Sequence, residues 1–112
     1  RTPVGPPRTR PVVRVDTGAR RRHTIAFADA ATPRRKARPA GVIGVEIWVK
    51  LGDPPPRDAG ELAFVSVVTR TPHVVDYPGE HGGVTAHYML RWVGTTGETG
   101  PWSETASATI VA

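Results

Sequence analysis

The chain has 112 residues with 12 Gly, 12 Pro and no Cys, and its formal net charge is +5. Without Cys it can form no disulfide scaffold, thiolate zinc site or cysteine nucleophile. Without Asn it has no N-glycosylation acceptor, and no apolar run approaches the roughly 20 residues of a membrane span. The length predicts one domain with one core. Because the first residue is Arg1 rather than Met, we expect a fragment or a processed product.

Charge is distributed unevenly along the chain. Residues 1–40 carry 11 cations and two acids, a net charge of +9, whereas residues 41–112 carry four cations and eight acids, a net charge of −4. This asymmetry indicates either an anion-binding region or electrostatic complementarity within the chain or between copies of it. The excess of Arg over Lys is typical of a GC-rich genome. The lack of Asn and Gln is typical either of heat adaptation or of the same genome bias, so a thermophilic origin is one of two hypotheses.

In chain order, the first feature is an arm and the rest is a series of strands. Residues 1–11 contain four Pro and are predicted to form an extended linker or arm, followed by one domain over residues 12–112. Period-two alternation of apolar residues predicts seven strands, at residues 13–16, 24–28, 43–51, 62–69, 73–77, 84–93 and 105–110. A helix over residues 19–32 is the rival interpretation, and we reject it because the large apolar residues there lie two apart.

The clearest strand pattern lies at residues 43–51. One parity is wholly apolar and is predicted to be buried, namely Ile43, Val45, Ile47, Val49 and Leu51. The other parity, with Glu46, Trp48 and Lys50, is predicted to face outward. Together with the turn-forming Gly and Pro between the strands, the pattern predicts an all-β fold, a seven-stranded antiparallel β-sandwich.

Residues near the C-terminal end resemble a known family. Leu90-Arg91-Trp92-Val93 is followed by a Gly-rich turn and by residues 97–104, which read Gly-Glu-Thr-Gly-Pro-Trp-Ser-Glu. With Pro78-Gly79 upstream, these residues resemble the F strand, F–G hairpin and G strand of a fibronectin type III domain. The resemblance covers about residues 10–112. The whole chain also resembles the C-terminal sandwich domain of bacterial proteins of unknown function in which a helical N-terminal region precedes a Pro-rich linker.

The resemblance carries expectations for particular positions. Residues 24–27 resemble the B strand, with Phe27 where the family usually has a core tryptophan, and residues 43–47 resemble the C strand, which neighbours the F strand. The corner tyrosine of the family aligns near Ala86, whereas this chain has Tyr88. Because the two positions share parity, we expect Tyr88 to face the core.

The residues that could support catalysis are few. The serines are Ser66, Ser103 and Ser107, and none lies in a Gly-x-Ser-x-Gly elbow. We therefore expect no catalytic residues, no bound cofactor and no enzyme activity. Metal ligands could come from His73 with Asp76 or from His81 with His87, but the spacing is not that of a dedicated site and His87 is on the outward parity of its strand, so no metal site is predicted.

Two sets of residues are predicted to contact partners. Arginine and lysine clusters could bind a polyanion: Arg20, Arg21, Arg22, Arg34, Arg35, Lys36 and Arg38. Trp48 and Arg91 share the outward parity of neighbouring strands, which predicts an Arg-on-Trp stack and, as the minority interpretation, an aromatic ligand platform.

The leading functional prediction is a non-catalytic interaction, spacer or self-assembly module of a bacterial protein, at the cell surface or in a filament. Its partners would be other protein domains or copies of itself, and the extracellular location rests on fold analogy. The alternatives are a polyanion-binding module and an accessory carbohydrate-binding module. No small-molecule substrate is indicated.

Overall fold

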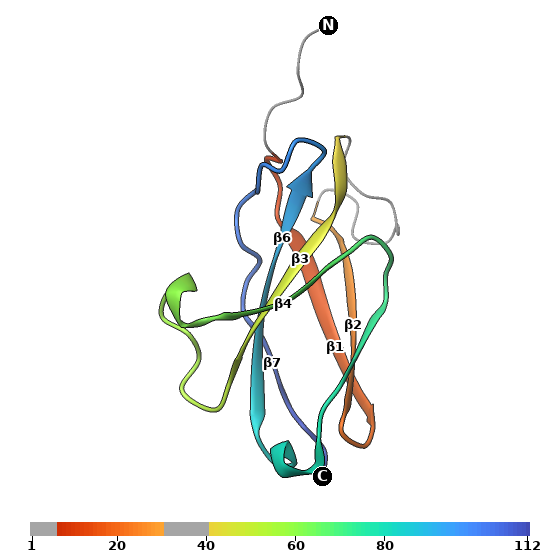
Figure 1. Cartoon of the computed structure of the whole chain (residues 1–112), viewed down its shortest axis with the longest axis vertical. Coiled ribbons are helices and arrows are strands. Elements are labelled where there is room, and N and C mark those ends of the chain that lie inside the picture. Colours follow the sequence, from red (N-terminus) through yellow and green to blue (C-terminus); the bar gives the residue numbers. More distant parts are fainter. Residues whose placement is uncertain (1–6, 31–40) are drawn as a thin grey trace, which may run out of the picture.

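The computed structural model describes residues 7–30 and 41–112, which form two antiparallel sheets and no α-helix (Figure 1). Sheet A has the strand order β1-β2-β5, and sheet B has the order β4-β3-β6-β7. The strands are β1 (Pro11–Ala19), β2 (Arg22–Asp29), β3 (Val42–Leu51), β4 (Ala63–Val68), β5 (His73–Asp76), β6 (Thr85–Gly94) and β7 (Ala106–Thr109). The prediction of an all-β chain with seven strands is confirmed, and the two-sheet arrangement is compatible with a β-sandwich.

Alternation along the strands builds one apolar core from both sheets. In β2 every second residue is buried, including Ile25 and Phe27. The rejection of a helix in this region is confirmed as far as residue 30, because period-two burial requires an extended chain. The fully or almost fully buried residues that meet this face are Val45, Ile47, Ala86, Tyr88, Leu90, Trp92 and Ile110.

The predicted buried parity of residues 43–51 holds only in the middle of β3. Val45, Ile47 and Val49 are buried, but Ile43 and Leu51 are 40% and 38% exposed. The register with β6 shifts between Val42 and Gly44, so that Val42 rather than Ile43 is buried. Leu51 is the last residue of the strand. The prediction was therefore wrong at both ends, where a bulge and a strand terminus override alternation.

A chain of hydrogen bonds through buried side chains links the two sheets. His23 of β2 and Tyr88 of β6 are both fully buried, and His23 Nδ1 lies 2.6 Å from the Tyr88 hydroxyl. The other ring nitrogen, Nε2, lies 3.1 Å from the Thr109 carbonyl oxygen of β7. Tyr77, which follows β5, places its hydroxyl 2.5 Å from that of Tyr88. The expectation that Tyr88 faces the core is confirmed.

The carbonyl at the end of this hydrogen-bond series determines which atom donates in each of its bonds. A carbonyl only accepts, so in the neutral ring His23 Nε2–H donates to Thr109 and Nδ1 accepts from the Tyr88 hydroxyl. The Tyr88 oxygen then accepts from the Tyr77 hydroxyl. Each buried polar atom of the three side chains has a partner, which makes the network stabilising rather than costly.

The loop between β3 and β4 is fixed by a capping box at a short 3₁₀ turn, η1 (Ala59–Glu61). The Asp58 side chain accepts from the Gly60 amide at 2.8 Å, and the Glu61 carboxylate accepts from the Asp58 amide at 3.3 Å and from the Arg57 amide at 2.7 Å. The Arg57 amide is the main group that holds the pKa of Glu61 below its ordinary value. These bonds define where β4 begins. The second 3₁₀ turn, η2 (Gly79–His81), precedes β6.

The hydrogen-bond chain gives a stability prediction. Tyr88→Phe leaves the buried His23 Nδ1 without a partner and removes the partner of the half-buried Tyr77 hydroxyl, so we expect the free energy of unfolding to fall by about 1–3 kcal/mol in urea denaturation. Tyr77→Phe keeps the Tyr88–His23 bond and should cost less. Equal losses in the two variants would contradict the central position of Tyr88 in the network.

The same tyrosines predict a loss of stability in alkali. Desolvation raises the pKa of Tyr77 and of Tyr88 in the folded protein. The unfolded state therefore loses these protons first, near a pKa of about 10. The tyrosines stabilise the fold fully below that pH, and their contribution falls as the pH rises above it. When urea midpoints are measured on both sides of this pH, the midpoint should fall more steeply with rising pH for the wild type than for Tyr88→Phe. Parallel curves would contradict the prediction.

Candidate functional site

The outward face of sheet B carries an aromatic–arginine cluster, which we define as Glu46, Trp48, Phe64, Arg91 and Trp102. Register places these side chains together: Glu46 of β3 is opposite Arg91 of β6, and Trp48 is opposite Phe64 of β4. Trp102 reaches the group from the segment between β6 and β7. Cross-strand neighbours on one face of a sheet lie close enough for side chains to touch.

Arg91 is at the centre of the cluster. Its Nε donates to Glu46 Oε1 at 2.6 Å, and the Trp48 indole N–H donates to the same oxygen at 3.0 Å. The guanidinium carbon lies 4.3 Å from the ring centroid of Trp102 and 5.9 Å from that of Trp48. The Arg91 and Glu46 side chains are only 25% and 17% exposed, so the pair is partly desolvated and stronger than an ordinary surface ion pair.

The predicted stack of Arg91 on Trp48 is confirmed, but the nearer ring is that of Trp102, which sequence reasoning missed. Trp102 lies outside any strand, so period-two alternation could not assign it to a face. The sequence feature that could have pointed to Trp102 is the Pro-Trp-Ser string, which follows the Gly-rich turn after β6.

The ring geometry does not favour a sugar-binding platform. Trp48 meets Phe64 at 67° and Trp102 at 87°, both edge-on. Stacking on a sugar ring needs an open flat face, whereas the Trp48 ring contacts two other rings and the Trp102 ring is contacted by the Arg91 guanidinium. Trp48 and Trp102 are half-buried, and only Phe64, at 53%, is largely exposed.

Phe64 belongs to β4, which differs from the other three edge strands. β1 carries Pro, Arg and Asp residues, and β5 and β7 are only four residues long. β4 reads Ala-Phe-Val-Ser-Val-Val, with no charge and no Pro, and Val67 on it is 43% exposed. Its one irregularity is a register shift that leaves Val65 as an extra residue. An uncharged, apolar edge is a template for pairing with another strand.

The first arginine cluster lies in and beside the turn between β1 and β2. Arg20 Nε donates to the Ala112 carbonyl at 2.9 Å, and Arg22 forms an ion pair with Asp76 at 2.7 Å. Arg21 has a left-handed backbone with φ of 55°, and its amide donates to the Val111 carbonyl. Two of the three guanidinium groups thus have acceptors within the chain. The second cluster, Arg34, Arg35, Lys36 and Arg38, lies outside the described residues.

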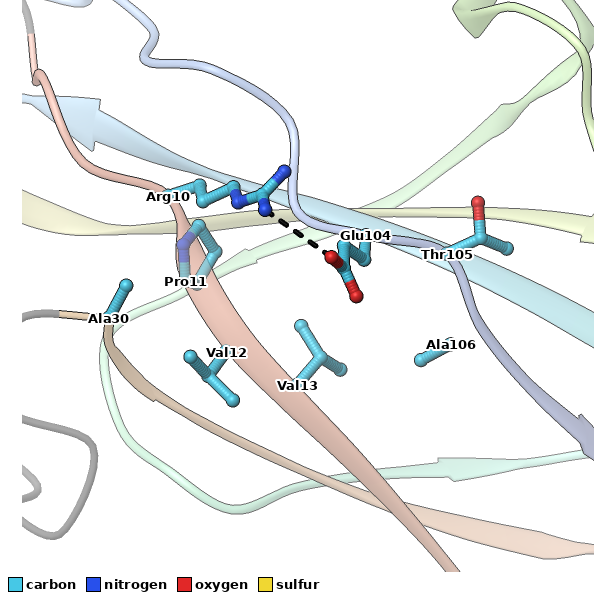
Figure 2. A pocket seen from close by; sticks show the side chains of 8 residues that line it. All are labelled: Arg10, Pro11, Val12, Val13, Ala30, Glu104, Thr105 and Ala106. Atoms are coloured by element: carbon cyan, nitrogen blue, oxygen red, sulfur yellow. Dashed lines mark hydrogen bonds and ion pairs between the residues drawn. The ribbon is translucent and has the colours of Figure 1, made fainter.

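A groove of about 330 Å³ lies between the start of β1 and the segment that leads into β7 (Figure 2). Arg10 and Glu104 point toward one another beside it, 3.3 Å apart, with side chains 51% and 83% exposed. The lining is otherwise mostly apolar and consists of Pro11, Val12, Val13, Ala30, Thr105 and Ala106. Its polar side chains are all exposed, so the groove offers a ligand little fixed polar recognition.

The expectation that His87 lies on the outward parity of its strand is confirmed, yet the residue is buried. It is only 2% exposed, because Ser107 of β7 and Asp53 of the loop after β3 hold its ring. His81 contacts the Tyr77 ring instead. Within residues 7–30 and 41–112, no three His, Cys, Asp or Glu side chains gather as a metal site.

No protein-family model matches this sequence, and a search of curated proteins finds no significant match. In the part of the chain that the structure describes, no helix is long and apolar enough to cross a membrane.

The partly buried ion pair of the aromatic–arginine cluster is predicted to contribute more to stability than an exposed ion pair. Arg91→Met leaves the partly buried Glu46 carboxylate without its cation, and we expect the free energy of unfolding to fall by about 2 kcal/mol. The matched control is Arg10→Met, which removes the exposed Arg10–Glu104 pair and should cost less than about 1 kcal/mol. Urea denaturation compares the two, and similar losses would contradict the burial argument.

Proposed function

We propose that this chain is a fibronectin type III-like sandwich that acts as an interaction and self-assembly module, and that two copies pair through their β4 edges. The observation that carries the proposal is the uncharged, apolar β4 edge next to the aromatic–arginine cluster.

Three features of the structure support a fibronectin type III-like fold. The segments that resemble the C and F strands are β3 and β6, and they are paired, as the resemblance implies. Phe27, at the position of the family's core tryptophan, packs edge-on against Trp92 with ring centroids 5.9 Å apart. The Trp-Ser string after the hairpin is anchored, since Ser103 Oγ accepts from the Leu90 amide at 2.9 Å.

The character of β4 supports pairing with a second copy. An antiparallel pair of identical strands is related by a two-fold axis, so the same patch serves both partners and the assembly closes as a dimer. A strand without charges opposes no like charges when it meets itself, whereas two β1 edges could bring Arg14 of each copy together.

Pairing would extend sheet B and place the exposed side chains of β4 in one row. Phe64 and Val67 both lie on the outward face, opposite Trp48 and Glu46 of β3. With the two-fold axis perpendicular to the sheet, the Phe64 and Val67 side chains of both copies share that face. Backbone hydrogen bonds and buried apolar area then act together, as in other cases of strand addition.

The test is the oligomeric state measured by sedimentation velocity over a range of concentrations. We expect a monomer–dimer equilibrium, and Val67→Lys should weaken dimerisation by about tenfold or more, equivalent to about 1.4 kcal/mol. A lysine on an edge strand opposes pairing because its charge must be desolvated.

The matched control is Val74→Lys on β5, the edge of sheet A, where the valine is 45% exposed against 43% for Val67. It should leave the dimer intact. A wild-type monomer at every concentration, an open series of larger polymers, or equal effects of the two lysines would each contradict pairing through β4.

Polyanion binding by the arginine clusters stays a prediction. The acceptors already bound to Arg20 and Arg22 do not favour it, because a ligand would first have to displace them.

A further inference from the structure

A serine, a histidine and a carboxylate form a hydrogen-bonded series at the β6–β7 side of sheet B. Ser107 Oγ lies 2.6 Å from His87 Nδ1, and His87 Nε2 lies 3.0 Å from Asp53 Oδ1. The three residues come from β7, β6 and the loop after β3, and the sequence separates Asp53 from Ser107 by 54 positions. None of them belongs to the aromatic–arginine cluster.

The carboxylate determines which histidine nitrogen carries the proton. An ionised carboxylate can only accept, so the neutral ring has its hydrogen on Nε2, which donates to Asp53. Nδ1 is then a free base, and it accepts the hydrogen of the Ser107 hydroxyl. This is the division of roles that activates a serine: a base on the hydroxyl and an acid group that holds the base in the correct tautomer.

Burial fixes the base while the nucleophile stays accessible. The His87 side chain is 2% exposed, whereas Ser107 is an exposed residue on an edge strand. Direct cross-strand pairing of His87 with Ser107 holds their separation. The other two serines differ. Ser66 Oγ donates to the Val67 carbonyl, and Ser103 is buried and donates to the Glu104 carbonyl.

We infer that Ser107 is a nucleophile that takes acyl groups from small activated carboxylic esters, with His87 as the base and Asp53 as the positioning residue. The Oγ–carbon bond forms as the Oγ proton moves to His87 Nδ1. The bond from carbon to the leaving oxygen then breaks, and the leaving alcohol or phenol takes the proton from His87. Water then attacks the acyl carbon and gives its proton to His87 Nδ1. The bond from the acyl carbon to Ser107 Oγ breaks, and Oγ takes the proton back from His87.

The inferred roles indicate slow turnover rather than efficient catalysis. His87 and Asp53 provide proton transfer, whereas stabilisation of the oxyanion is a separate and usually larger contribution. Covalent labelling of Ser107 is therefore a better readout than steady-state hydrolysis.

The experiment uses the whole chain and a fluorophosphonate probe, which forms a stable bond to activated serines and releases fluoride. Intact-mass measurement should show one adduct, and peptide mapping should place it on Ser107. Ser107→Ala should abolish it, and Asp53→Asn should slow labelling by about tenfold or more, because the amide can donate to Nε2 and so reverse the tautomer.

Two further variants separate positioning from structure. Asp53→Glu restores the carboxylate and should recover labelling. Asp58→Asn makes the same chemical change in the same loop without touching His87, and should have no effect. Because the chain has no Cys, Ser107→Cys also introduces a single thiol, and its alkylation by iodoacetamide should slow when Asp53→Asn is added.

Absence of any adduct on Ser107, labelling of Ser66 at the same rate, or equal rates with Asp53 and with Asn at position 53 would overturn the inference. The measurement is repeated on Val67→Lys, because Ser107 lies on the opposite edge of sheet B from β4. Labelling of that variant at the wild-type rate is expected whether or not the proposed dimer forms.

Discussion

The buried hydrogen-bond chain from Tyr77 through Tyr88 and His23 to the Thr109 carbonyl is the constraint on which the rest of the structure depends. Apolar packing holds two sheets together but tolerates sliding between them, because it has little directional preference. Hydrogen bonds that must be satisfied in a dry interior do have a direction, and here they join β2 and the end of β5 to β6 and β7. These bonds therefore favour one position of the two sheets relative to each other.

The outward face of sheet B holds the aromatic–arginine cluster, next to the edge proposed for pairing, and the series of Ser107, His87 and Asp53 inferred to activate a serine. Toward β4, Arg91 joins Glu46 and two tryptophans and leaves Phe64 exposed beside the apolar edge. Toward β7, a histidine at a position where a strand pattern predicts exposure is buried beneath a loop carboxylate and a serine. The Arg91–Glu46 pair on this face is partly desolvated on both sides, which strengthens its electrostatic interaction relative to that of freely exposed side chains.

Prediction from the sequence succeeded where a local rule decides and failed where a contact between distant residues decides. The central residues of β3 face the core because alternation is a property of any extended chain, but the bulge at Val42–Gly44 exposes Ile43 against that rule. The Arg91–Trp48 contact followed from parity and neighbouring strands, whereas Trp102 comes from an irregular segment with no period. Asp53, after the end of β3, meets His87 only because a loop turns back over the sheet.

By itself, the sequence determined the all-β class, the approximate positions of seven strands and the inward direction of Tyr88, since these depend on side-chain periodicity and on turn-forming Gly and Pro. Composition also excluded cysteine chemistry, whatever the fold. The tertiary structure alone decided which strand edge is unprotected, which tryptophan covers Arg91 and which serine meets a base. Those properties depend on strand order, bulges and loop paths, which arise from packing across long stretches of sequence and leave no local periodic signal.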